Sequence, residues 1–351
     1  MRFRFSLLCL LLGLASGTRA WELTSEAYRI GPADSIQEAV DAAATNATIK
    51  TVEFKEGIYL PQRPGPALVY LNRRHDGLHL KALGRVTLTA ANSQLASPSN
   101  PASPAIVNHI LYLGDGLSSN TIIEGFRLTG ANHYVSPSFG AEVEPDREIR
   151  KGRFYYCDGG AIKIYHRSSP TLLRLQIEDN YASPCAGGIS IQQEGASEVP
   201  VLIQDCKFIN NRAEVTGGAL DLLWGSSAQV ANCVFVSNVS NTGPGEGYNP
   251  FTNNGVVTVF PRSKAVFRHC TFTGNRNGVD DMGGASQYLD CLFYENRLEA
   301  GLPGQRRFEL DLQRGGVVRQ CVIKGPLLDP LGAVSATNNL INPPGLELGA
   351  D

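Results

Sequence analysis

The chain has 351 residues, of which 42% are hydrophobic and 18% are charged, and its formal net charge is −2. A chain of this kind can bury a sizeable core, and repeat or all-β proteins of this length often form a single unit. The sequence has no stripe of clustered Lys and Arg, which phosphate binding requires, so we expect no nucleic-acid partner.

The first twenty residues predict a secretory signal peptide. Two arginines precede an apolar run at 7–14, and small residues then lead to a cleavage site at Thr18-x-Ala20. The apolar run is too short to span a bilayer, which takes about 20 residues. We therefore expect residues 1–20 to be removed, and the mature chain to be secreted, periplasmic or held at the cell surface, without a membrane span.

Two short elements follow the predicted signal. SIQEAVDAA at 35–43 has the apolar spacing of an amphipathic helix, and TVEFKEGIYL at 51–60 has the alternation of a strand.

A Gly-Gly motif recurs in the middle of the chain. It stands at 158–164 as DGGAIKI, at 186–191 as AGGISI and at 216–222 as TGGALDL, and NGVVTVF at 254–260 is a weaker copy. Each copy predicts a glycine corner that leads into a short strand of alternating apolar residues and then into a turn.

A second motif, Cys-x-Phe-x-x-Asn, stands at 206–211, 233–238, 270–275 and 291–296. Its Cys and Phe are two residues apart, so both point to one face of a strand. Its Asn falls where the strand should end in a turn, because Asn tolerates left-handed backbone and can hydrogen-bond locally. The copies are unevenly spaced, which indicates coils of about twenty residues that carry loops of varied length.

Together the two motifs describe one rung of a parallel β-helix. Rungs stacked about 4.8 Å apart place Cys on Cys, Phe on Phe and Asn on Asn. The Cys and Phe side chains should then fill the tube, and the Asn side chains should hydrogen-bond as a ladder along one corner.

The repeated pattern resembles secreted bacterial proteins of the right-handed parallel β-helix superfamily, which is pectate-lyase-like (the pectin-lyase fold). IIEGFRLTGAN at 122–132 is a further rung of this kind. The resemblance implies an all-β, single-stranded right-handed solenoid whose N-terminal helix caps the core. We expect one domain over 21–351, with the cap at about 27–60, the rungs at about 61–326 and a tail at 327–351. The resemblance specifies the fold strongly and the function weakly.

Seven cysteines remain after the signal peptide. We expect the five in the repeat to be buried and mostly reduced. Cys157 and Cys185 each stand two residues before a Gly-Gly corner on adjacent rungs, and they either form a disulfide or stay as two thiols. No zinc-type Cys/His spacing occurs, so we predict no metal site. The question of a cofactor such as Ca²⁺ stays open, because no recognisable motif is present.

Two long insertions, 132–157 and 238–254, enter at the same corner of the repeat and predict the walls of a groove about 14 Å across, at 4.8 Å per rung. Their aromatic side chains offer apolar faces to sugar rings, and we expect Tyr155, Tyr156, Tyr248 and Phe251 to bind substrate.

The predicted floor of the groove is the outward row of the strands that follow the Gly-Gly corners. This row contains Lys163, Ser190 and Asp221, and His166 and Arg167 lie just beyond the first strand. We expect Ser190 to bind substrate and the other four to be catalytic, because β-elimination needs a base and a cation that neutralises the substrate carboxylate. The alternative is that all five are ordinary solvated side chains.

These expectations describe a secreted monomer that binds and cleaves polysaccharide, as a lyase rather than a glycoside hydrolase if it is an enzyme. The alternative is a non-catalytic cell-surface or adhesive β-helix protein, for which the solenoid serves as a spacer and a display surface.

Overall fold

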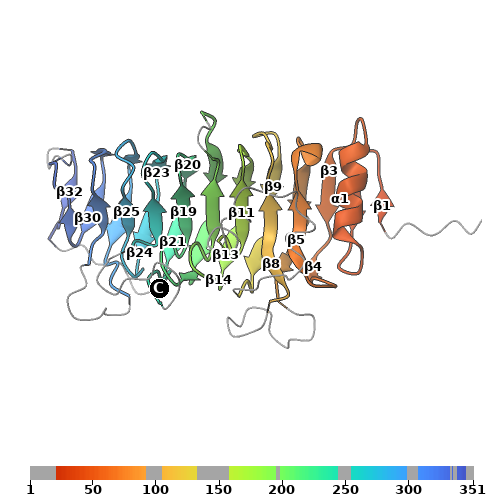
Figure 1. The fold of residues 1–351 in the computed structure, drawn as a ribbon, viewed down its shortest axis with the longest axis horizontal. Helices are drawn as coiled ribbons and strands as arrows, with labels where there is room; N and C mark the ends of the chain where they lie inside the picture. Colours follow the sequence, from red (N-terminus) through yellow and green to blue (C-terminus); the bar gives the residue numbers. More distant parts are fainter. Residues whose placement is uncertain are drawn as a thin grey trace, which may run out of the picture.

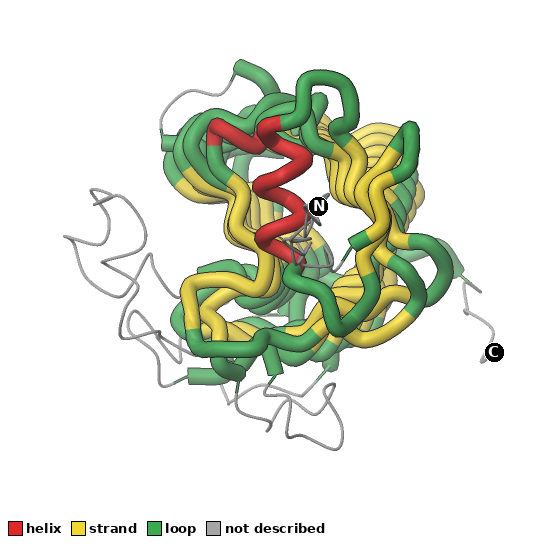
Figure 2. The backbone as a smooth tube through the Cα atoms, turned by 90° about the vertical axis from the view of Figure 1, so that its right-hand side faces the viewer, coloured by secondary structure: helices red, strands yellow, loops and turns green. Residues whose placement is uncertain are grey.

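The computed structural model describes residues 21–91, 105–132, 158–194, 198–243, 254–298, 307–332, 334 and 338–344. Over these residues the chain winds into a tube of stacked coils (Figures 1 and 2), and three long sheets run along the tube. Strands of successive coils pair in parallel, whereas β1 pairs with β2 in antiparallel fashion at the N-terminal end. The predicted parallel β-helix is therefore confirmed.

The first sheet has eleven strands, in the order β1 (Glu22–Leu23), β2 (Ala27–Ile30), β3 (Thr51–Phe54), β6 (His79–Ala82), β9 (Ile122–Glu124), β12 (Thr171–Leu173), β16 (Val201–Gln204), β20 (Ser227–Ala231), β23 (Lys264–Arg268), β26 (Gln287–Leu289) and β29 (Val317–Arg319). The second sheet has ten: β4 (Gly57–Tyr59), β7 (Val86–Thr89), β10 (Arg127–Thr129), β13 (Gln176–Glu178), β17 (Lys207–Ile209), β21 (Val234–Val236), β24 (Thr271–Thr273), β27 (Leu292–Tyr294), β30 (Val322–Lys324) and β32 (Leu340–Ile341).

The third sheet has nine strands: β5 (Gly65–Leu71), β8 (Val107–Leu113), β11 (Ile162–Tyr165), β15 (Ile189–Gln192), β19 (Leu220–Leu223), β22 (Val257–Val259), β25 (Val279–Asp281), β28 (Leu310–Leu312) and β31 (Leu327–Leu328). A small fourth sheet pairs β14 (Tyr181–Ala182) with β18 (Arg212–Ala213). It lies between the Asn corner and the Gly-Gly corner of two rungs.

The Cys-x-Phe-x-x-Asn motif builds the second sheet. Its Phe is the middle residue of the strand, points into the tube and stacks on the Phe of the next rung. The ring centroids are 4.5 Å apart for Phe208 and Phe235, 4.6 Å for Phe235 and Phe272, and 4.8 Å for Phe272 and Phe293. The predicted inward stack is therefore confirmed.

The Asn residues form the predicted ladder. Each side-chain amide donates to the Oδ1 atom of the next Asn over 2.7–3.0 Å, through Asn180, Asn211, Asn238, Asn275 and Asn296. The Asn296 amide donates to the carboxyl group of Glu309, which ends the ladder. The left-handed residue at this corner is the one before the ladder Asn, such as Asn210 with φ of 50°. That residue turns the chain, and the Asn that follows it can point its amide along the stack.

The five repeat cysteines are buried free thiols, as predicted. The backbone N–H of Cys206 donates to the sulfur of Cys233 over 3.4 Å, and that of Cys291 donates to the sulfur of Cys321 over 3.4 Å. Each thiol therefore lies against the backbone of a neighbouring rung.

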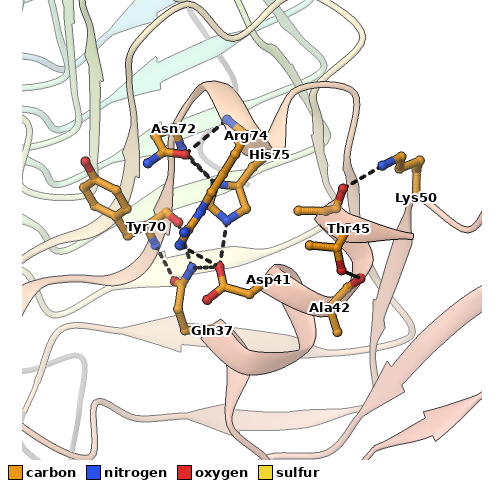
Figure 3. Close-up of polar contacts among 10 residues, drawn as sticks. Gln37, Asp41, Ala42, Thr45, Lys50, Tyr70, Asn72, Arg74 and His75 are labelled. Atoms are coloured by element: carbon orange, nitrogen blue, oxygen red, sulfur yellow. Dashed lines mark hydrogen bonds and ion pairs between the residues drawn. The ribbon is translucent and has the colours of Figure 1, made fainter. Parts of the chain in front are cut away.

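Helix α1 (Ile36–Thr45) covers the N-terminal end of the tube (Figure 2), and its buried face packs against the core. The Gln37 side chain pairs with the main chain of Tyr70 in β5, donating to its carbonyl and accepting from its N–H, both over 3.0 Å (Figure 3). The Gln37 side-chain amide thus satisfies the backbone N–H and carbonyl of Tyr70 at the edge of the third sheet. Asp41 accepts from Gln37, forms an ion pair with Arg74 and lies 2.8 Å from His75 Nε2, and both partners belong to the 3₁₀ helix η1 (Arg73–His75). The predicted cap is confirmed.

The solenoid continues past residue 326, where we expected a tail to begin. β31 pairs with β28, and β32 pairs with β30, although neither strand carries the repeat motif. Asn339 takes the place of the next ladder cysteine. Its Oδ1 atom accepts from the N–H of Cys321 over 3.0 Å, as the Cys321 sulfur accepts from the N–H of Cys291. The described part of the chain contains no helix that is long and apolar enough to cross a membrane.

Candidate functional site

The predicted row of polar residues exists. Lys163 in β11 pairs in register with Ser190 in β15, which pairs with Asp221 in β19 and then with Thr258 in β22. The inward neighbours Ile162, Ile189, Leu220 and Val257 are aligned in the same way and buried. The alternation in the sequence therefore predicts both the strands and their register.

The row is buried rather than solvated. The exposed fraction is 3% for Lys163 and 0% for both Ser190 and Asp221. One cause is the path of the Gly-Gly corner, which folds back against the outward side chains. A Cβ atom on Gly217, whose φ is +56°, would lie 1.9 Å from Asp221 Oδ1. The glycine is therefore needed for the close approach as well as for the turn.

Lys163 hydrogen-bonds within the row. Its Nζ atom donates to Ser190 Oγ over 3.3 Å and to Gln192 Oε1 over 3.0 Å. It also lies 5.9 Å from the centroid of the Tyr165 ring. These contacts hold the ammonium group in one place, and a buried cation of this kind requires a nearby negative charge.

Asp158 lies near this cation, and sequence reasoning missed it because it precedes a Gly-Gly corner and looked like part of the turn. Its carboxyl group is buried, and its Oδ1 atom accepts from the N–H of Cys185 over 3.2 Å. Its Oδ2 atom has no hydrogen-bond partner among the described residues. Burial raises the pKa of Asp158 to about 7, although the Lys163 ammonium opposes the shift.

Asp221 is the second buried carboxyl group. Its Oδ2 atom accepts from Thr216 Oγ1 over 2.7 Å. Burial raises its pKa well above the usual range of an aspartate, with a further rise from the carboxyl groups of Asp158 and Asp280, while the hydrogen bond from Thr216 opposes the shift. The neutral form is thus favoured.

Cys185 joins the same cluster, and its side chain is buried. Burial raises its pKa well above the usual value, and the carboxyl groups of Asp158 and Asp221 raise it further. Its proposed disulfide partner, Cys157, lies outside the described residues, so the pairing stays a prediction.

His166 and Arg167 lie apart from the row. They follow β11 in the turn between the third and first sheets, with φ of 44° and 57°. The His166 side chain is 45% exposed, and its Nδ1 atom lies 3.4 Å from Asp115 Oδ1. No hydrogen bond or ion pair among the described residues joins His166 or Arg167 to Lys163 or Asp221. A left-handed turn carries them to the corner, although they are close to Lys163 in sequence.

The remaining predicted site residues cannot be placed. Tyr155, Tyr156, Tyr248 and Phe251, which were assigned to the walls of the groove, lie outside the described residues. Within the described ranges, no three His, Cys, Asp or Glu side chains are grouped so that they could hold a metal ion.

The row continues beyond Thr258 with Asp280 and Asp311. Burial and the carboxyl group of Asp311 together raise the pKa of Asp280 to about 8, against the hydrogen bond from Gln313 over 2.8 Å. The neighbouring Asp281 accepts instead from the hydroxyl of Tyr288 over 2.8 Å. The two adjacent acids therefore have separate surroundings, as neighbours on a strand should.

The fold and this row define a parallel β-helix protein with a buried lysine–carboxyl cluster. Residues 111–298, more than half of the chain, match the family model for the right-handed β-helix region, and the chain belongs to this family. No curated protein and no solved structure matches the chain.

Proposed function

We propose that this chain is an exported β-helix protein that binds an acidic polysaccharide and cleaves it by β-elimination at the Lys163 row. The observation that carries the proposal is the presence, in one small cluster, of a lysine and two buried carboxyl groups with different surroundings. Groups of this kind are concentrated at catalytic sites, and different environments assign them different roles in proton transfer.

The three side chains are suited to three parts of the reaction. Asp158, which titrates near neutral pH, accepts the proton from the carbon next to the sugar carboxylate. Lys163 neutralises the charge that develops on that carboxylate. The electron pair forms a carbon–carbon double bond, the glycosidic bond breaks, and Asp221 in its neutral form donates a proton to the departing oxygen.

The Gly-Gly corners bury the Lys163 row, although a substrate has to reach it for cleavage. This burial favours a second candidate function, in which the chain does not act as an enzyme. In that case the cluster only joins the rungs, and the chain is a non-catalytic surface or adhesive protein. Lys163 already has two hydrogen-bond acceptors inside the row, which is consistent with such a structural role.

The experiment that separates the two functions is a screen of the purified chain against acidic and neutral polysaccharides. The absorbance of unsaturated products reports elimination, and the release of reducing ends reports any cleavage. Cleavage of an acidic polysaccharide with unsaturated product supports the proposal. Binding without either signal favours the adhesive function.

The predicted walls of the groove have their own test. Tyr156→Ala and Tyr248→Ala should each weaken binding of the polysaccharide found in the screen and leave the thermal midpoint nearly unchanged, because loop side chains add little to a core. Unchanged affinity in both variants would remove the two loops from the binding site.

A further inference from the structure

Trp224 is exposed at the corner where the third sheet turns into the first. Its exposed fraction is 39%, and it is the one aromatic residue among the large apolar side chains that the described residues leave exposed. It directly follows β19, the strand that carries Asp221. A tryptophan in this place contributes less to the core than a fully buried one, because more than a third of its surface remains in contact with water.

The backbone at this position makes tryptophan a costly choice. Trp224 has φ of 47°, and His166, which holds the same position two rungs earlier, is also left-handed, with φ of 44°. Bulky residues rarely adopt this conformation, which Gly, Asn and Asp adopt with less strain. A strained, exposed aromatic residue indicates a role outside the fold.

Phe260, on the next rung, extends the apolar surface. Its ring centroid lies 6.2 Å from that of Trp224, with 36° between the ring planes. The N–H of Phe260 donates to the carbonyl of Leu222 over 2.9 Å, which fixes the residue beside β19. The two rings, which we call the corner ledge, therefore form a partly exposed aromatic surface directly after β19 and β22.

Positive charge lies beside the ledge. Arg262 lies in the turn that follows Phe260, Lys264 is the first residue of β23, and both are exposed. Neither forms an ion pair with any described residue. Glu194 is an acidic residue on the rung before Trp224. The ledge is thus an aromatic surface with cations along one side.

We propose that the corner ledge binds one carboxylate-bearing sugar residue of an acidic polysaccharide. The apolar face of the sugar ring stacks on Trp224 and Phe260, and Arg262 pairs with the carboxylate. The identity of the ligand rests on the proposed function, but the ledge is separate from the buried row and does not depend on cleavage.

The chain has two tryptophans, so Trp21→Phe leaves Trp224 as the only indole fluorophore. This variant should be titrated with oligomers of galacturonate and mannuronate, and with neutral oligomers of galactose and mannose. We expect a saturable change in emission with at least one acidic oligomer and a weaker change with the neutral ones. Trp224→Ala in the otherwise unchanged chain should weaken binding about tenfold by titration calorimetry, and Arg262→Ala should weaken only the binding of acidic oligomers.

Matched controls are present in the chain. Ile58→Ala changes an exposed apolar residue in the second sheet, and Arg85→Ala changes an exposed arginine outside the ledge. Both should bind like the unchanged chain. Trp224→Asn should lose binding but keep or raise the thermal midpoint, because Asn tolerates the left-handed backbone.

The outcomes separate the ledge from the proposed function. A change in the Trp224 emission of Trp21→Phe on addition of an acidic oligomer, together with weaker binding by Trp224→Ala, supports the ledge. This holds even if no oligomer is cleaved. Cleavage by the unchanged chain with no emission response to any oligomer overturns the ledge and leaves the proposed function standing. Equal affinity of Trp224→Ala and the unchanged chain also overturns it, as does the absence of binding to every oligomer.

Discussion

The Asn211 amide donates to the Oδ1 atom of Asn238 over 3.0 Å, and that same Oδ1 atom accepts from the backbone N–H of Asn211 over 2.9 Å. One side chain therefore satisfies both a buried amide group and a buried backbone donor of the rung before it. The contact recurs at each step of the ladder, so the corner between the second and third sheets contains few unpaired polar groups.

Replacing Asn238 by leucine, which has similar volume, should destabilise the chain strongly. It removes the acceptor of the Asn211 N–H and the donor to the carbonyl of Phe208. Each buried group that is left unsatisfied costs about 1–3 kcal/mol. Asn120→Leu, in an exposed turn, is the control. Equal midpoints of urea denaturation for the two variants would show that the ladder does not stabilise the fold.

Phe235→Ala should lower the free energy of unfolding by about 3–5 kcal/mol. Phe235 is fully buried and stacks between Phe208 and Phe272, so its loss weakens two interfaces between rungs. The measurement is chemical denaturation, with Ile58→Ala as the exposed control. A free energy of unfolding unchanged from that of the parent chain would contradict the inward stack.

The ladder thiols should not react with a thiol reagent in the native chain and should react after denaturation. The hydrogen bond with the Cys233 thiol and burial together raise the pKa of Cys270 to about 12, against the hydrogen bond with Cys291. A thiol with a raised pKa is a poor nucleophile. Mass mapping under non-reducing conditions would also test the Cys157–Cys185 pair. A Cys206–Cys233 disulfide would contradict the picture of stacked, separate thiols.

Stability should fall as the pH rises from about 4 to about 7, because Asp158 is harder to ionise in the folded chain. Its folded pKa of about 7 is above the value of an unfolded aspartate. Between these values the folded state binds more protons, so raising the pH favours unfolding. The contribution is fully present below the unfolded pKa and is lost as the pH rises through the folded one.

Urea denaturation at several pH values in this window tests the effect. Asp158→Asn should flatten the dependence of the free energy of unfolding on pH. The pKa of Asp280 is also raised, so Asp280→Asn should flatten the same dependence towards higher pH. A slope in Asp158→Asn equal to that of the parent chain would mean that Asp158 is ionised as easily in the folded chain as in the unfolded one.

The sequence predicts the tube well because its repeats place identical side chains at identical points. The Phe stack, the Asn ladder and the register of Lys163 with Ser190 follow from spacing alone, since a parallel strand repeats its neighbour's pattern. The helix at 35–43 was also predictable from its apolar spacing, and the observed helix is α1, Ile36–Thr45.

The site was predicted less well, because burial depends on the path of the corners. Nothing in the strand pattern indicates that Gly217 folds against Asp221, and so the row was expected to be solvated. Asp158 was hidden in a turn motif. Trp224 gave no signal, because a tryptophan beside a strand is read as core, and only its exposure identifies it as a surface residue.

The most direct test of cleavage at the Lys163 row is the rate of unsaturated-product formation by Lys163→Met. The test uses the polysaccharide that the screen finds, with binding measured in parallel. Methionine keeps most of the side-chain volume and removes the charge, and Asp311→Asn, further along the same row, is the control. The account predicts that Lys163→Met forms product at least a hundredfold more slowly while it still binds, an effect of the size expected for a lost charge-stabilising group. Product formation at the parent rate in Lys163→Met would contradict it.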